Sequence, residues 1–117
     1  MQKSILIVED EFLIAMDLQG ILEANGWKVL GPVANVQRAL RLLEAQLPSV
    51  SILDVNLGHE LVTPVAEYLQ QHGVPFAVAS AYDQPERVGG AALAGVPNVG
   101  KPTAMKRLFT VLADLTI

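Results

Sequence analysis

The 117-residue chain contains no cysteine, few aromatic residues and fewer basic than acidic side chains. The lack of cysteine excludes disulfide frameworks, cysteine nucleophiles and thiolate metal sites. Eight Lys and Arg against twelve Asp and Glu give a net charge of -4, which argues against direct nucleic-acid binding through a broad basic surface. No apolar run approaches the roughly 18 residues that cross a bilayer, and no signal-peptide pattern is present, so we expect a cytoplasmic protein without membrane contact.

Hydrophobic residues make up 51% of the chain, and they recur in short runs separated by helical stripes. This alternation is typical of βα units, and no linker or repeat divides the chain, so we expect one domain over 1–117. The segment 83–93 predicts a weak helix, because glycines interrupt it. The predicted strands cover 4–8, 27–30, 50–53, 76–79 and 96–100, the last a poor edge strand because it contains Pro97.

Five strands alternating with five helices require right-handed crossovers and a parallel sheet with helices on both faces. The predicted fold class is therefore α/β, a (βα)5 doubly wound three-layer sandwich. We expect the flavodoxin-like strand order 2-1-3-4-5, in which ligands bind outside the carboxyl ends of the strands.

Polar residues follow four of the five predicted strands. Glu9, Asp10 and Glu11 follow the first, Asp54 the third, Ser80 the fourth and Lys101-Pro102 the fifth. In the expected strand order these four strand ends are contiguous. The side chains should therefore converge on one cleft.

Carboxylates gathered in one cleft repel each other unless a cation lies between them. Oxygen ligands without His or Cys favour Mg²⁺ over zinc, held by Glu9, Asp10, Asp54 and the backbone carbonyl of Asn56. A divalent cation and the Lys101 ammonium around one carboxylate would neutralise a phosphoryl group. These residues predict phosphoryl chemistry at Asp54, with the Ser80 hydroxyl as a further donor.

Simpler interpretations exist for each residue alone, including an acidic first helical turn and a solvated lysine. Two other functions also use this architecture. A haloacid-dehalogenase-like phosphohydrolase has a strand-end Asp and Mg²⁺ but needs a second acid two residues later, where this chain has Asn56. A flavodoxin-like carrier needs a phosphate loop after the first strand, where this chain has acids that repel phosphate.

The chain resembles the receiver domain of bacterial two-component response regulators along its whole length. The resemblance implies that Glu9 and Asp10 help to bind Mg²⁺, and that Asp54 accepts a phosphoryl group from a sensor histidine kinase or phosphotransfer protein. It further implies that Ser80 and Lys101 contact this group and that the bond before Pro102 is cis. Such a domain is a signalling phosphoacceptor and not an enzyme acting on other substrates. The matching motifs are ILIVEDE at 5–11, ILDVNL at 52–57, FAVASAY at 76–82 and GKP at 100–102.

The chain departs from this family at Asn98, where receivers usually carry Tyr or Phe. The segment 76–82 also resembles the FAT GUY group of single-domain receivers, which lacks that aromatic residue. We therefore expect Tyr82 to change its burial on phosphorylation in place of the missing ring. In receivers, the positions of Asn56 and Tyr82 tune dephosphorylation. The sequence leaves open the downstream protein partner and whether the chain forms a homodimer.

Overall fold

The structure, a computed structural model, describes residues 3–116. Strands and helices alternate along the chain, as the sequence predicts. The elements are β1 Ser4–Val8, α1 Phe12–Ala24, β2 Lys28–Val33, α2 Val36–Ala45, β3 Val50–Asp54, α3 Thr63–Gln71, β4 Phe76–Ala79, α4 Glu86–Gly89, the 3-10 helix η1 Ala91–Leu93, and α5 Met105–Leu115.

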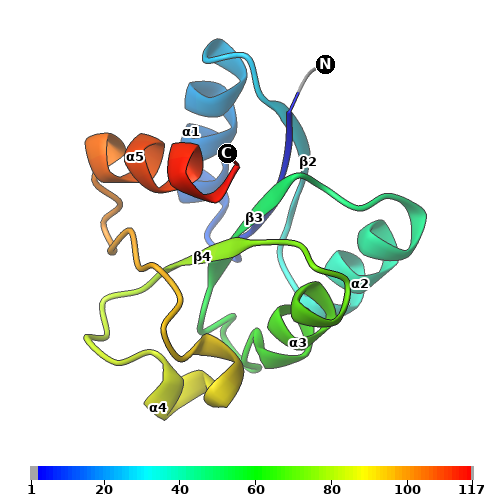
Figure 1. Cartoon of the computed structure of the whole chain (residues 1–117), viewed down its shortest axis with the longest axis vertical. Coiled ribbons are helices and arrows are strands. Elements are labelled where there is room, and N and C mark those ends of the chain that lie inside the picture. The colour runs from blue at the N-terminus through cyan, green and yellow to red at the C-terminus, as the bar shows by residue number, and fades with distance from the viewer. Residues whose placement is uncertain (1–2, 117) are drawn as a thin grey trace.

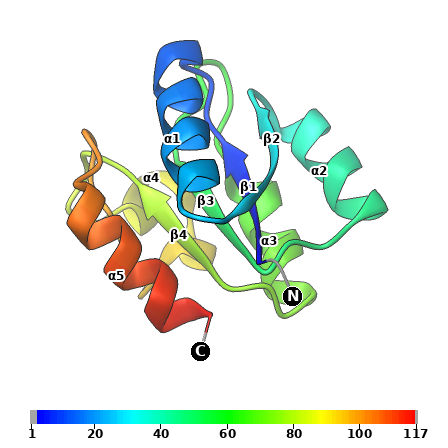
Figure 2. The ribbon, with the colours of Figure 1, turned by 90° about the horizontal axis from the view of Figure 1, so that it is seen from above.

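The sheet is parallel, with four strands in the order β2-β1-β3-β4 (Figure 1). Helices α1 and α5 lie on one face, and α2 and α3 lie on the other (Figure 2). This arrangement confirms the doubly wound sandwich. The order reverses between β1 and β3, so the carboxyl ends of these two strands form the crevice that such sheets use for ligands.

Two apolar cores hold the layers together, because successive side chains of a strand point to opposite faces of the sheet. Ile5 and Ile7 of β1 pack with α1 and α5, whereas Leu6 and Val8 pack with α2 and α3. All five β1 residues are buried. β1 is thus a central strand packed on both faces, which explains its continuous apolar sequence.

The predicted fifth strand is wrong in extent. Residues 97–99 run parallel to β4 but form only one isolated bridge, between Val78 and Asn98. Pro97 explains this shortness, since it has no N–H to donate to a ladder. The segment nevertheless lies beside β4, where the predicted strand order placed it. It leads to Lys101, at the edge of the sheet formed by the carboxyl ends of the strands.

The extents of β2 and of the predicted helix at 83–93 also differ from those predicted from the sequence. β2 continues to Val33 through Gly31-Pro32, which the sequence analysis took as the strand end. Gly31 has φ 85°, and a Cβ there would lie 2.8 Å from the Val33 nitrogen, so only glycine lets this edge strand continue. The predicted weak helix is a single turn, α4, separated from η1 by Gly90 with φ 94°.

Candidate functional site

The acidic residues meet because β1 and β3 pair in register. Val8 lies opposite Leu53, so the next residues, Glu9 and Asp54, leave adjacent strands at the same edge. Glu9 is 4% exposed and Asp54 is 5% exposed. One oxygen atom from each of Glu9, Asp10 and Asp54 lies within 4.8 Å of the others. The structure therefore brings together three carboxylates that the sequence analysis assigned to one cleft.

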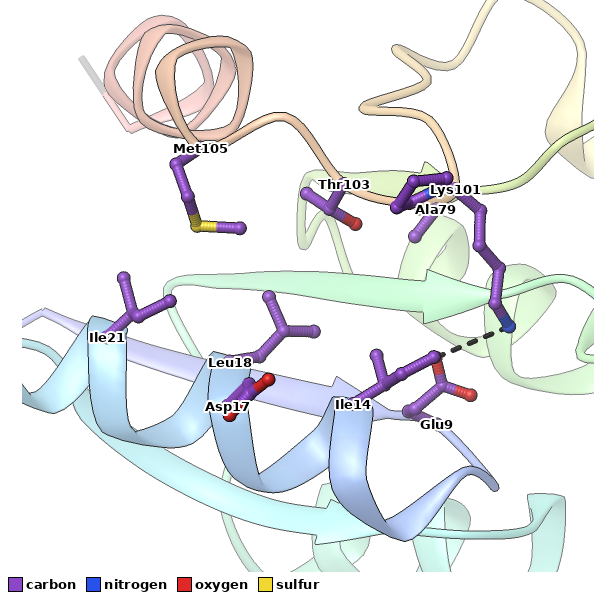
Figure 3. Close-up of a pocket in the computed structure, with 10 residues that line it drawn as sticks. Glu9, Ile14, Asp17, Leu18, Ile21, Ala79, Lys101, Thr103 and Met105 are labelled. Carbon is purple, nitrogen blue, oxygen red and sulfur yellow. Dashed lines mark ion pairs between the residues drawn. The ribbon is translucent and has the colours of Figure 1, made fainter.

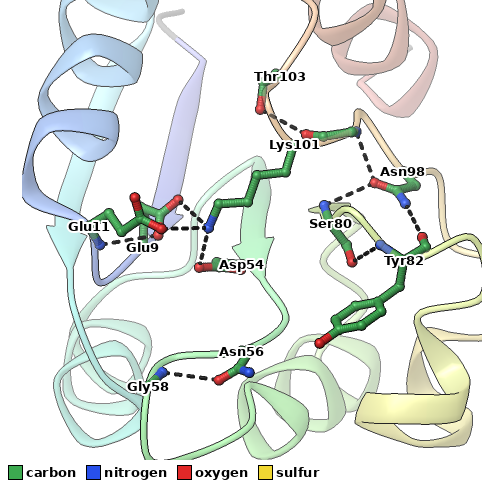
Figure 4. A network of polar contacts seen from close by, with 11 residues as sticks. Glu9, Glu11, Asp54, Asn56, Gly58, Ser80, Tyr82, Asn98, Lys101 and Thr103 are labelled. Carbon is green, nitrogen blue, oxygen red and sulfur yellow. Dashed lines mark hydrogen bonds and ion pairs between the residues drawn. The ribbon is translucent and has the colours of Figure 1, made fainter.

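The Lys101 ammonium is the counter-charge of this cluster. Its Nζ donates a hydrogen bond to Asp54 Oδ2 at 2.9 Å and lies 3.5 Å from Glu9 Oε1 (Figures 3 and 4). The exposed Glu11 carboxylate also approaches Nζ, at 3.4 Å. The Lys101-Pro102 peptide bond is cis. The lysine thus crosses from the segment beside β4 to the ends of β1 and β3.

The protonation equilibria of Glu9 and Lys101 reflect this crowding. Burial, followed by the adjacent Asp54 carboxylate, raises the pKa of Glu9 from 4.5 to about 8. Burial alone would lower the pKa of Lys101, but the hydrogen bond and charge of Asp54 outweigh burial and raise it. The charge of Lys101 lowers the pKa of Glu9, but it does not offset burial and the Asp54 carboxylate together.

An open pocket of about 480 Å³ gives access to Asp54. Ser80, which is buried at the end of β4, lines the pocket opposite the acidic residues. Its Oγ accepts a hydrogen bond from the Tyr82 N–H at 3.0 Å. A smaller pocket of about 190 Å³, lined mainly by apolar residues of α1 and the start of α5, lies next to Lys101 (Figure 3). Asp54, Ser80 and Lys101 thus face a common space that a small anion could enter.

Asn56 lies in the loop after β3, with its side chain engaged in the loop itself. Its Oδ1 accepts a hydrogen bond from the Gly58 N–H at 3.1 Å. Asn56 also forms an isolated antiparallel bridge with Leu61. An amide cannot protonate a leaving group, so this geometry adds nothing to the phosphohydrolase alternative.

Asn98 and Tyr82 belong to a hydrogen-bond network beside the pocket (Figure 4). The Asn98 side chain bonds to the backbone of Ser80, Tyr82 and Gly100. The Tyr82 side chain is 45% exposed. From the sequence alone, Asn98 is notable only because receivers usually carry an aromatic ring at this position. Asn98 lies between Pro97, which cannot donate to a sheet ladder, and Gly100. A polar amide at such a position is the sequence signal that could have indicated the hydrogen-bonding role of Asn98.

Glu11 is a second residue that the sequence analysis undervalued. It lies outside the carboxylate cluster but contacts Lys101, and its N–H donates to Glu9 Oε2 at 3.2 Å. A lysine side chain is long enough to reach a carboxylate at the start of α1 from the segment beside β4. Glu11 therefore orients two members of the site from its rim.

A doubly wound sheet with a strand-end aspartate, two further acids and a lysine at its switch point defines the class of phosphoacceptor signalling domains. Residues 5–113 match the response regulator receiver domain family. The chain belongs to this family. Nothing in the comparisons favours a phosphohydrolase.

Relatives and solved structures agree with this assignment. The chain is 36% identical over 90 residues to the phyllosphere-induced regulator PhyR of Methylorubrum extorquens, covering 74% of this chain and 33% of the relative. It is 32% identical over 94 residues to the transcriptional regulatory protein PdtaR of Mycobacterium tuberculosis, covering 80% and 46%. It thus spans half or less of these relatives. The BeF3-activated SdrG structure from Pseudomonas melonis Fr1 has 38% identity and TM-score 0.78, covering 100% of both chains.

No helix within residues 3–116 is long and apolar enough to cross a membrane.

Proposed function

We propose that this domain relays a signal by accepting a phosphoryl group on Asp54. The observation that carries the proposal is the buried Asp54 carboxylate, held by Lys101 at 2.9 Å and open to a pocket that Ser80 also lines. Burial of an aspartate beside an ammonium in an accessible pocket is typical of a functional carboxylate. The BeF3-activated conformation of the related SdrG supports the same use of the fold.

The carboxylates fit a magnesium ion. Glu9, Asp10 and Asp54 supply hard oxygen donors within 4.8 Å of one another, and the Asn56 backbone carbonyl would add a fourth. The pKa of Glu9, which burial and then the adjacent Asp54 carboxylate raise, supports a site in which a cation would stabilise the charged carboxylates. When bound, Mg²⁺ supplies electrostatic stabilisation of the charge that develops on the transferred phosphoryl oxygens.

Asp54, Lys101 and Ser80 each have a separate role in the transfer of the phosphoryl group. Asp54 Oδ1 attacks phosphorus while the bond from phosphorus to the histidine nitrogen of the donor breaks, which leaves an acyl phosphate and a histidine that takes up a proton. Lys101 binds Oδ2 and leaves Oδ1 available for the attack. The Lys101 ammonium and the Ser80 hydroxyl then donate to the phosphoryl oxygens. The products are phospho-Asp54 and unmodified donor.

We assign the phosphoryl donor to a sensor histidine kinase or a histidine phosphotransfer protein. Such a partner must contact the rim of the pocket. Phe12 and Leu13 at the start of α1 are 73% and 77% exposed, and Met16 one turn later is 45% exposed. Large apolar side chains exposed together are typical of a docking surface. The cytoplasmic location and the single-domain organisation over 1–117 stay predictions.

The test is incubation with Mg²⁺ and acetyl phosphate, followed by intact mass measurement. We expect one added phosphoryl group in the presence of the divalent metal and none in its absence, because the cation offsets the repulsion between carboxylates and donor. Asp54→Asn should not be labelled. Equal labelling of this variant would overturn the assignment.

A further inference from the structure

We propose that Asn98 is a positioning residue for the phosphorylation of Asp54, whose side-chain amide sets the spacing between Ser80 and Lys101. The inference rests on the proposed function, since Ser80 and Lys101 are the groups assigned to the phosphoryl oxygens. Asn98 is not among the residues that line the pocket, and its side-chain hydrogen bonds go to backbone groups and not to a carboxylate. It acts through the backbone on both sides of the pocket.

One oxygen atom connects these two sides. Asn98 Oδ1 accepts hydrogen bonds from the N–H of Ser80 at 3.1 Å and from the N–H of Gly100 at 2.9 Å (Figure 4). Ser80 directly follows β4, and Gly100 directly precedes Lys101. The oxygen has two lone pairs, and both are used. A single acceptor oxygen therefore links the backbone at Ser80 with the backbone at Gly100.

Among residues 3–116, no backbone hydrogen bond between the two segments reaches Ser80 or Gly100. The Val78 N–H donates to Pro97 O, and the Val99 N–H donates to Val78 O, each at 2.9 Å. Within residues 3–116, this backbone pairing stops before Ser80. Beyond Val78 and Val99, the Asn98 side chain connects the two segments. It accepts hydrogen bonds from the Ser80 N–H and from the N–H of Gly100, the residue before Lys101.

The surrounding partners also determine which way the amide faces. Asn98 Nδ2 donates to the Tyr82 carbonyl at 3.0 Å. A reversed amide would place its NH₂ against two N–H donors and its oxygen against a carbonyl. From the outer side, Arg107 Nε of α5 donates to the Asn98 backbone carbonyl at 3.1 Å. The amide thus has one favourable orientation on an anchored backbone.

The network also prepares the Ser80 hydroxyl. The Tyr82 N–H occupies an acceptor position on Ser80 Oγ, while the Tyr82 carbonyl is held by Asn98. A hydroxyl has one proton to donate, and this arrangement keeps that proton available for a phosphoryl oxygen. Loss of the Asn98 amide would leave two backbone N–H groups without their acceptor and release both sides of the pocket.

The test compares Asn98→Ala with the parent chain. At saturating Mg²⁺ and acetyl phosphate, we expect the maximal rate of labelling to fall about tenfold, because displaced contacts lose transition-state stabilisation. The dissociation constant for Mg²⁺ should stay unchanged, since Asn98 does not touch the acidic cluster. Asn35→Ala is the matched control: it loses a similar bond, from the Arg38 N–H to Asn35 Oδ1 at 2.9 Å, at the start of α2. This control should keep the parent labelling rate.

A second variant isolates the acceptor oxygen. Asn98→Asp keeps an acceptor for Ser80 and Gly100 but replaces the bond to the Tyr82 carbonyl by a carboxylate oxygen that repels this carbonyl. Its added charge acts on binding of the anionic donor, so the comparison is made at saturating acetyl phosphate. We expect a maximal rate closer to that of the parent than to that of Asn98→Ala.

The outcomes separate this inference from the proposed function. If the parent is labelled on Asp54 and Asn98→Ala reaches the same maximal rate, the positioning role is overturned while the proposed function stands. Parallel losses of labelling and Mg²⁺ affinity would also overturn it, because they indicate general collapse of the site. If the parent itself is not labelled, the proposed function fails first.

Discussion

The two sides of the pocket are built differently. On one side, Glu9 and Asp54 continue directly from β1 and β3, which pair in register and are buried on both faces. On the other side, Ser80 and Lys101 lie on segments joined by one bridge and one side-chain amide. The acidic side is thus held by the core of the protein. The side that carries Ser80 and Lys101 is called the donor side, because both residues can donate hydrogen bonds to a phosphoryl group. It is held by a few hydrogen bonds, and such weakly packed regions rearrange at low cost in free energy.

Under the proposed function, this difference matters because the domain would change shape when Asp54 is phosphorylated. The carboxylates need fixed positions to bind a cation and to expose one oxygen for attack. The donor side has to respond once the phosphoryl group is present. A rigid acidic side and an adjustable donor side would allow phosphorylation of Asp54 to alter the surface near α4 without disturbing the carboxylates.

Lys101→Ala should have the largest effect, because within residues 3–116 every ion pair between the two sides involves this ammonium. We expect the maximal rate of labelling with acetyl phosphate to fall about a hundredfold, as when an oxyanion donor is removed from an active site. Lys106→Ala removes the same charge from an exposed position on α5 and should leave the rate unchanged. Equal slowing of both variants would show that general electrostatics, and not contact with Asp54, explains the effect.

Asp10→Ala should weaken Mg²⁺ binding by about tenfold, because it removes one carboxylate from the cluster. Glu11→Ala should weaken it less, since Glu11 reaches Lys101 from the rim and lies outside the cluster. Titration with Mg²⁺, monitored by NMR chemical shifts, measures both affinities. Identical losses would mean that the ligand assignment is displaced by one residue.

Leu13→Asp should produce a smaller and selective effect. We expect phosphotransfer from a histidine-phosphorylated partner to slow about fivefold, while labelling by acetyl phosphate stays unchanged, because only a protein donor needs the exposed start of α1. Leu47→Asp is the matched control: Leu47 is 45% exposed and lies before β3, at the opposite end of the strand from Asp54. If Leu47→Asp slows transfer as much, the proposed docking surface is wrong.

The acidic side of the pocket was predictable from the sequence. Short apolar runs that end in Glu9 and Asp54 indicate buried parallel strands, and the strand order brings their ends together. Periodicity and local motifs are enough where the backbone ladder determines position.

The donor side was only partly predictable. Ser80 and Lys101 could be placed at strand ends, but the extent of the fifth strand was wrong because Pro97 restricts pairing. The role of Asn98 depends on loop backbone that brings three separate residues around one amide. No periodic pattern encodes such contacts. The path of β2 through Gly31-Pro32 was missed because those residues usually end a strand.

The most direct test of this two-sided account is amide hydrogen exchange with and without beryllofluoride, in the presence of Mg²⁺. We predict the largest change between Ser80 and Leu93, where Gly90 separates two short helices, and little change in β1 and β3. Tyr82→Ala should remove the change in 83–93 while Asp54 is still labelled by acetyl phosphate. Exchange that changes chiefly around Asn98, with 80–93 unaffected, would contradict the account.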